Sequence, residues 1–241
     1  MRRRDRERAE SLKRDRETAA QSFFEAHAAD WDRIRSLHVA EANVEAAMRE
    51  ALGPGPFKFL LDLGTGTGRT LELFADRYAR GLGIDVNQAM LTYARARLAK
   101  TGRNNAQVRH GDIYALSIGD GTADAIVMHQ VLHFLSDPAL AIREAARVLQ
   151  PGGKLLIVDF APHALEFLRE TEAHERLGFS GHQVKQWLAD AGLVTRGLRD
   201  LRPLAGDTEG KLTISVWLAE RAEHKKPGSA KTVAPSLEDA E

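Results

Sequence analysis

From residue 57 onward, short apolar runs alternate with segments of helical period, and this alternation constrains the fold more than any other feature. The runs resemble strands that are covered on both faces, whereas the segments between them repeat apolar residues at the spacing of a helix with one buried face. The expected strands are 57–63, 81–85, 106–112, 124–131, 154–160, 193–201 and 211–220. The expected helices are 69–78, 88–102, a segment capped by Asp137 and closed by 151–153, and 181–191. This order predicts an α/β fold, doubly wound around a mostly parallel sheet.

A glycine-rich turn follows the first expected strand, in the stretch LLDLGTGTGR at 60–69. A dinucleotide-binding turn requires G-x-G-x-x-G, but its third glycine position holds Arg69, and Gly68 comes one residue too early. A phosphate-binding P-loop also fails, because no Gly-Lys-Ser/Thr follows. The turn by itself therefore leaves two interpretations open, a ligand site and a simple tight corner.

One acidic residue ends each of the first three expected strands: Asp62, Asp85 and Asp112. In parallel sheets, ligands bind at the carboxyl ends of the strands, beside the point where the strand order reverses. There, Asp62 would face an amino group, Asp85 would accept hydrogen bonds from two ribose hydroxyls, and Asp112 would accept one from an adenine amine beside Ile113. This set suits a ligand with an ammonium, a ribose and an adenine, and it suits a pyrophosphate poorly.

These residues belong to a longer pattern that resembles the class I S-adenosylmethionine-dependent methyltransferases. The matching stretches are LLDLGTGTGR, GLGIDVNQAML, RHGDIYAL, DAIVMHQVLHFLSDP and ARVLQPGGKLLIVDF, which cover roughly residues 57–160. The resemblance implies a Rossmann-like methyltransferase fold with a seven-stranded sheet, its last strand antiparallel, and an N-terminal helical extension. It also implies S-adenosylmethionine as cofactor and S-adenosylhomocysteine as product. The contacts that it implies are Asp62, Gly64, Thr65, Gly66, Asp85, Val86, Asp112, Ile113 and His129.

Within that class, residues 23–47 and 158–180 resemble the methyltransferase domain of bacterial ArsR-type regulator fusions. Residues 1–56 are too few, and wrongly patterned, to hold the winged-helix regulator itself. Two interpretations follow, a free-standing relative and a chain whose DNA-binding half is missing. The expected division is a charged helix or disordered segment at 1–22, a helical lid or extension at 23–56, the cofactor-binding domain at 57–222 and a disordered tail at 223–241.

Histidines after the fourth and fifth expected strands are the candidates for general-base catalysis. His129 and His133 are four residues apart, so both would face the cofactor if their segment were helical, and His163 follows the fifth strand. We expect His133 and His163 to be catalytic, with a role as pocket lining left open for each. None of the histidines has the spacing of an established zinc motif, and we expect no metal site.

The composition of the chain excludes several classes of substrate and partner. The chain has no cysteine, which excludes disulfides, thiolate metal sites and the thiolates with which arsenite methylation usually holds arsenic. Lys plus Arg equals Asp plus Glu at 34 each, and no basic, aromatic-studded groove is visible, so we expect no direct nucleic-acid binding. No apolar run approaches the ~20 residues that span a bilayer, and we expect a cytoplasmic protein with no membrane partner.

The predicted function is methyl transfer from S-adenosylmethionine to a small organic acceptor by in-line displacement. A homodimer remains open. The alternative is a non-catalytic module that senses S-adenosylmethionine or S-adenosylhomocysteine and is linked to transcriptional regulation.

Overall fold

The computed structural model describes residues 18–36, 40–102, 104–203 and 211–223. Within them, seven strands form one sheet in the order β3-β2-β1-β4-β5-β7-β6. The strands are β1 (Phe57–Leu63), β2 (Tyr78–Asp85), β3 (Ala106–His110), β4 (Ala123–His129), β5 (Leu149–Phe160), β6 (Leu193–Leu201) and β7 (Ile214–Arg221). The predicted α/β fold with a seven-stranded sheet is confirmed.

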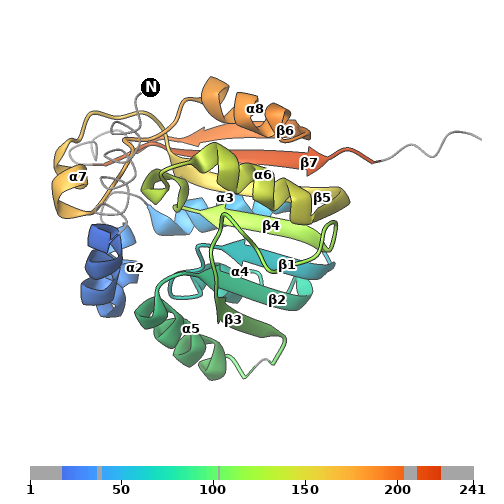
Figure 1. Cartoon of the computed structure of the whole chain (residues 1–241), viewed down its shortest axis with the longest axis horizontal. Helices are drawn as coiled ribbons and strands as arrows, with labels where there is room; N and C mark the ends of the chain where they lie inside the picture. The colour runs from blue at the N-terminus through green and yellow to red at the C-terminus, as the bar shows by residue number, and fades with distance from the viewer. Residues whose placement is uncertain (1–17, 37–39, 103, 204–210, 224–241) are drawn as a thin grey trace, which may run out of the picture.

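The parallel strands of this sheet all have their carboxyl ends on the same side. Strands β1 to β5 pair in parallel, whereas β7 runs antiparallel to both of its neighbours, β5 and β6. The order reverses between β1 and β4, so a topological switch point lies at their carboxyl ends. In Figure 1 the arrow of β7 points to the right, and α2 and α7 lie at the opposite side, at the carboxyl ends of the parallel strands.

Helices cover both faces of the sheet (Figure 1). Helices α6 and α8 pack on one face through a core that includes Ile142 and Leu188, and α3, α4 and α5 pack on the other face through a core that includes Met48 and Leu71. The helical elements are η1 (Ala28–Asp30), α2 (Trp31–Ser36), α3 (Glu41–Leu52), α4 (Arg69–Leu73), α5 (Gln88–Lys100), η2 (Leu132–Phe134), α6 (Pro138–Val148), α7 (Phe167–Thr171) and α8 (Gly181–Asp190). A further helical stretch covers 18–27.

Side-chain caps fix where three of the helices, α5, α6 and α8, begin. Asn87 accepts a hydrogen bond from Met90 N at the start of α5, and Ser180 accepts one from Gln183 N at the start of α8. Asp137 caps α6 by accepting from Leu140 N, as expected from the Asp-Pro pair at this position. Each cap satisfies a backbone N–H group that the helix itself leaves without a partner.

Several boundaries differ from the sequence-based prediction. The helix expected at 69–78 ends at Leu73, because β2 begins already at Tyr78 to pair with β1. The Pro-Gly-Gly at 151–153 does not close α6, which ends at Val148, but lies inside β5. The predictions for residues 1–17 and for the tail at 224–241 lie outside the described residues.

Among the residues that the structure describes, no helix combines the length and the apolar character that a membrane span requires.

Candidate functional site

A cavity of about 410 Å³ lies at the carboxyl ends of β1, β2 and β4, at the switch point of the sheet. The glycine turn after β1 forms one part of the wall, and the N-terminal residues Gln21, Phe24 and Trp31 form another part, with Trp31 beside the turn. Eight of the nine predicted cofactor contacts line this cavity: Gly64, Thr65, Gly66, Asp85, Val86, Asp112, Ile113 and His129. The fold therefore brings together residues that lie up to 65 positions apart in the chain.

The glycine turn requires glycine at Gly64 for two independent reasons. The residue has φ +72°, a left-handed conformation that residues with a Cβ adopt only at a cost. A Cβ built at this position would also lie 2.3 Å from Cγ2 of Val131, in the loop after β4. Gly64 N donates to Ile84 O at 2.9 Å, which ties the turn to β2. The backbone of the turn is thereby held close to the cavity.

Asp62 does not line the cavity but lies behind the glycine turn, with only 1% of its surface exposed. Its Oδ2 accepts a hydrogen bond from Thr65 Oγ1 at 2.6 Å, while its Oδ1 has no hydrogen-bond partner among the described residues. Burial, reinforced by the negative charge of Asp85, raises the pKa of Asp62 to about 7. A buried carboxylate oxygen with no donor fits the amino group that the sequence placed here.

Asp85 and Asp112 lie where the sequence predicts the ribose and the adenine. Asp85 accepts hydrogen bonds from Gly66 N and Asn87 N, both at 2.8 Å, and burial raises its pKa despite these donors. Asp112 is exposed and accepts from Tyr114 N at 2.8 Å, beside the buried side chain of Ile113. Both carboxylates are thus oriented by backbone donors.

His129 ends β4 and meets Arg35, a residue that sequence reasoning missed. Arg35 Nη1 lies 3.4 Å from His129 Nδ1, and both side chains line the cavity. Burial, followed by the positive charge of Arg35, lowers the pKa of His129 well below its usual range. The imidazole is therefore neutral at pH 7. The sequence feature that could have indicated Arg35 is its position four residues after Trp31, because this spacing places both side chains on one face of α2.

The two predicted catalytic histidines are not among the residues that line this cavity. The segment from His129 to His133 is not one helix, because His129 belongs to β4 and His133 to η2. His133 is 2% exposed, and its Nδ1 lies 2.8 Å from Asp159 Oδ1. Asp159 also accepts hydrogen bonds from the backbone of Leu132 and Phe160, so this pair joins η2 to β5. His133 thus has a structural partner in Asp159.

His163 lies further from the glycine turn, in the segment after β5. Its N–H donates to Leu177 O at 3.1 Å, and its Nδ1 accepts from Leu165 N at 3.3 Å. Its ring packs edge-on against Phe160 at 5.8 Å between centroids. Across the described residues, no group of three or more His, Cys, Asp or Glu side chains is arranged to hold a metal ion.

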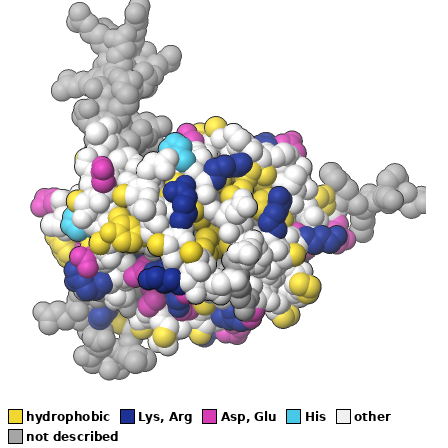
Figure 2. Space-filling model, turned by 90° about the horizontal axis from the view of Figure 1, so that it is seen from below, with side chains coloured by type: hydrophobic (Ala, Val, Ile, Leu, Met, Phe, Trp, Pro, Cys, Tyr) yellow, Lys and Arg dark blue, Asp and Glu magenta, His cyan; other side chains and the backbone are white. Residues whose placement is uncertain are grey.

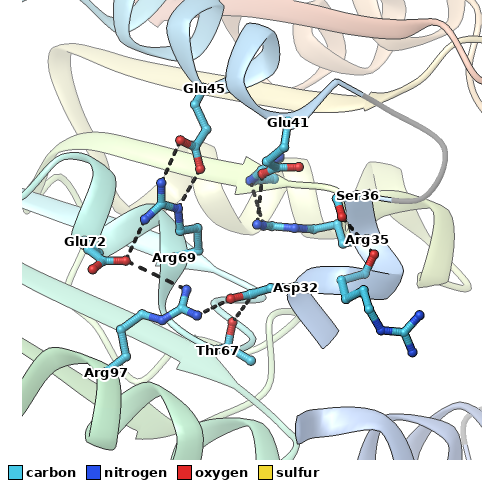
Figure 3. Close-up of polar contacts among 11 residues, drawn as sticks. Asp32, Arg35, Ser36, Glu41, Glu45, Thr67, Arg69, Glu72 and Arg97 are labelled. Atoms are coloured by element: carbon cyan, nitrogen blue, oxygen red, sulfur yellow. Dashed lines mark hydrogen bonds and ion pairs between the residues drawn. The ribbon is translucent and has the colours of Figure 1, made fainter. Parts of the chain in front are cut away.

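Charged side chains connect the N-terminal wall of the cavity to the body of the domain (Figure 3). Asp32 accepts a hydrogen bond from Thr67 Oγ1 at 2.8 Å and pairs with Arg97 on α5. Burial opposes ionisation of Asp32, but hydrogen bonds from Arg97 and Thr67 lower its pKa overall. Because Thr67 belongs to the glycine turn, one carboxylate links α2 to both the turn and α5.

Replacing Asp32 with alanine is expected to weaken binding of S-adenosylhomocysteine, the product implied by the sequence resemblance, about fivefold. An ion pair and a hydrogen bond together contribute about 1 kcal/mol at a partly exposed site. Calorimetry measures the change in affinity. Asp30→Ala is the matched control, since Asp30 lies on the neighbouring turn and pairs with the exposed Arg33, at 3.9 Å. Equal losses in the two variants would show that Asp32 has no special role in holding the wall.

Comparisons with known proteins point to methyltransferases. Residues 61–157 match a family model described as a methyltransferase domain. A 37.1 kDa protein in transposon TN4556 of Streptomyces fradiae is 34% identical over 172 residues, which are 64% of this chain and 49% of that protein. A probable S-adenosylmethionine-dependent methyltransferase of Mycolicibacterium smegmatis is 32% identical over 143 residues, which are 54% of this chain and 53% of that protein. This chain spans about half the length of these curated relatives.

Among solved structures, geranyl diphosphate methyltransferase in complex with S-adenosylmethionine has the same fold, with a TM-score of 0.64 and 20% identity over 76% of this chain and 86% of that one. The fold and the match over residues 61–157 agree with a class I S-adenosylmethionine-dependent methyltransferase domain. Residues 61–157 of this chain are thus similar to a methyltransferase domain, and the comparisons support S-adenosylmethionine as the cofactor.

Proposed function

We propose that this protein transfers the methyl group of S-adenosylmethionine to a small organic acceptor. The observation that carries the proposal is the cavity at the switch point, where the glycine turn lies between the strand ends that bear Asp62, Asp85 and Asp112. In this proposal Asp85 binds the ribose, Asp112 and Ile113 hold the adenine, and Asp62 faces the amino group of the methionine arm. The unpartnered Oδ1 of Asp62 supports the last assignment.

The cofactor supplies a sulfonium, which is already a good leaving group, so the protein needs no acid for in-line displacement. The chain must place the accepting atom about 3–3.5 Å from the methyl carbon and must exclude water. Phe24, Trp31 and Phe134 serve both purposes in this proposal, because their rings pack together at 4.8–6.1 Å between centroids and line the cavity. They form an apolar wall around the reaction.

A base is needed only for an acceptor that must lose a proton. His133 and His163 remain predictions for this role, although neither lines the cavity. The ring of His133 lies 3.9 Å from that of Phe134, which lines the cavity, and 4.8 Å from that of Phe160, between centroids. An acceptor that loses its proton to water, or has none to lose, fits the cavity better.

The predictions about nucleic-acid binding, cellular location and oligomeric state remain proposals. On the face drawn in Figure 2, Lys and Arg side chains are separated by hydrophobic and acidic ones, which supports the expectation of no direct nucleic-acid binding. Cytoplasmic residence and a homodimer also remain predictions. The sensing alternative, and the resemblance to regulator fusions, gain no support from the relatives named above.

The test combines binding with turnover. Calorimetry is expected to detect S-adenosylhomocysteine binding to the wild-type protein, and labelled S-adenosylmethionine is expected to transfer its methyl group to a component of a small-molecule extract. Asp85→Ala should weaken binding about hundredfold, since it removes two hydrogen bonds to a charged group. Asp190→Ala, at an exposed carboxylate on α8, is the control and should have no effect. Binding without any labelled component would favour the sensing alternative, and absence of binding would contradict both.

A further inference from the structure

We infer that Gln130 is a specificity-determining residue of the cavity, and that it recognises a neutral aromatic acceptor through a carboxamide or lactam group on the acceptor's ring. The inference rests on the proposed function and deepens it, because it names the chemical class of the methyl acceptor. Gln130 lines the cavity directly after β4, and none of the roles proposed above uses it.

The side-chain amide of Gln130 is buried in the cavity wall without a hydrogen-bond partner. The residue is only 4% exposed, and neither its Nε2 nor its Oε1 is hydrogen-bonded within the part of the chain that the structure describes. A buried polar group without a partner lowers stability, and such groups are rare in native proteins. A ligand group that both donates and accepts a hydrogen bond would satisfy the two atoms at once.

The backbone of Gln130 is also held in an uncommon conformation. Its φ is +51°, in the left-handed region that glycine tolerates and that is strained for a residue with a long side chain. Its N–H donates to Val158 O on β5 at 2.7 Å, which anchors the residue between the ends of β4 and β5. Strained residues cluster at binding and catalytic sites, where the surrounding structure holds them in place. The strained backbone and the unpaired amide therefore point independently to a ligand.

The position of Gln130 in the sheet points to the acceptor rather than to the nucleoside of the cofactor. Asp85 ends β2 and Asp112 follows β3, and both strands lie on one side of β1. Gln130 follows β4 and is bonded to β5, on the other side of β1 (Figure 1). The amide thus lies across the switch point from the carboxylates that the proposed function assigns to the ribose and the adenine.

The hydrogen-bonding capacity of the amide and the rings around the cavity favour a neutral aromatic group. A carboxylate would offer only acceptors and leave Gln130 Oε1 without a donor, whereas an ammonium would offer only donors and leave Nε2 without an acceptor. A carboxamide or a lactam presents a donor beside an acceptor and carries no charge. Phe24, Trp31 and Phe134 line the same cavity, and aromatic rings pack favourably against one another in offset or edge-to-face arrangements. A flat ring that bears an amide matches both features.

The experiment titrates three probes that differ in their polar group into the protein loaded with S-adenosylhomocysteine. Benzamide presents a donor and an acceptor, benzoate presents only acceptors, and benzylamine in its ammonium form presents only donors. The wild-type protein is expected to bind benzamide about tenfold more tightly than either of the other probes, and Gln130→Met should weaken benzamide binding about tenfold. S-Adenosylhomocysteine itself should bind to Gln130→Met as it binds to the wild type. Calorimetry measures each affinity.

Thermal unfolding gives a second readout, whose sign a purely structural role would not produce. Gln130→Met removes the unpaired amide, so the unliganded variant should have a Tm about 2–4 °C above that of the wild type. Gln150→Met is the matched control, because Gln150 Nε2 donates to Asp124 Oδ1 at 2.8 Å. It should lower the Tm and leave benzamide binding unchanged. Gln130→Asn keeps an amide and tolerates the left-handed backbone, but it retracts the amide by one methylene group, so it should also lose the preference for benzamide.

Two binding results would overturn the inference and leave the proposed function intact. One is equal affinity of the wild-type protein for the three probes, and the other is a loss of S-adenosylhomocysteine binding in Gln130→Met that matches its loss of benzamide binding. A lowered Tm of Gln130→Met would also contradict the inference, because the amide would then stabilise the protein itself. Failure of the proposed function has a different signature, since the wild-type protein would then bind no S-adenosylhomocysteine before any probe is added, and this result would overturn both.

Discussion

Replacing Gly64 with alanine is expected to abolish binding of S-adenosylhomocysteine and to lower the free energy of unfolding by about 2–5 kcal/mol. The left-handed backbone of Gly64 contributes one part of this loss, since a residue with a Cβ is strained at φ +72°. The larger part comes from the contact at 2.3 Å between the new Cβ and Val131, which forces the glycine turn away from β4. Chemical denaturation and calorimetry measure the two effects.

Gly102→Ala separates backbone strain from contact. Gly102 has nearly the same conformation, with φ +67°, but a Cβ at this position would meet nothing within 4 Å. We expect this variant to lose about 1–2 kcal/mol and to bind the cofactor normally. If Gly64→Ala were no more destabilised than Gly102→Ala and still bound S-adenosylhomocysteine, the close packing of the turn against Val131 would be irrelevant to the site.

The second large effect is a dependence of cofactor affinity on pH that arises from Asp62. Below pH 7 the unliganded protein holds Asp62 protonated, because burial raises its pKa to about 7. A bound ammonium group favours the ionised carboxylate, so binding releases a proton. Affinity for S-adenosylhomocysteine should therefore rise up to about tenfold per pH unit as the pH increases toward 7 and should level off above it. Calorimetry between pH 5.5 and 7.5 measures this slope.

Two controls assign the slope to Asp62. Asp62→Asn is expected to bind S-adenosylhomocysteine about tenfold or more weakly at pH 7.5, with an affinity that no longer changes with pH. The probe 5′-methylthioadenosine lacks the ammonium and should show little pH dependence with the wild-type protein. His129 contributes no slope in this range, since its lowered pKa keeps it neutral. The same slope in Asp62→Asn would assign the titration to another group.

The sequence predicted the sheet because its signals are local. Strand β1 and helix α8 lie almost where the apolar pattern placed them, and Asp137 caps α6 as its position before a proline indicates. Boundaries that depend on pairing were predicted less well. The start of β2 at Tyr78 is determined by its register with β1, which no periodicity within the segment reveals.

The residues of the candidate site were likewise predicted where they depend on local signals and missed where they depend on long-range contacts. Parallel strands bring their carboxyl ends to one edge, so the positions of Asp85 and Asp112 followed from where their strands end. The role of His133 could not be judged in this manner, since its neighbour Asp159 comes from a different strand, 26 residues away. Arg35 was missed because its contact with His129 joins residues 94 positions apart.

The amino-acid sequence by itself determined the α/β architecture, the glycine turn and the acidic residues at the strand ends, because each depends on short-range periodicity or on a strand terminus. Only the tertiary structure decided which histidine reaches the cavity, that Asp62 is buried behind the turn, and that the N-terminal segment supplies Arg35 to the wall. Burial and long-range contact set the protonation and orientation of these side chains, and both quantities depend on neighbours that are distant in the chain.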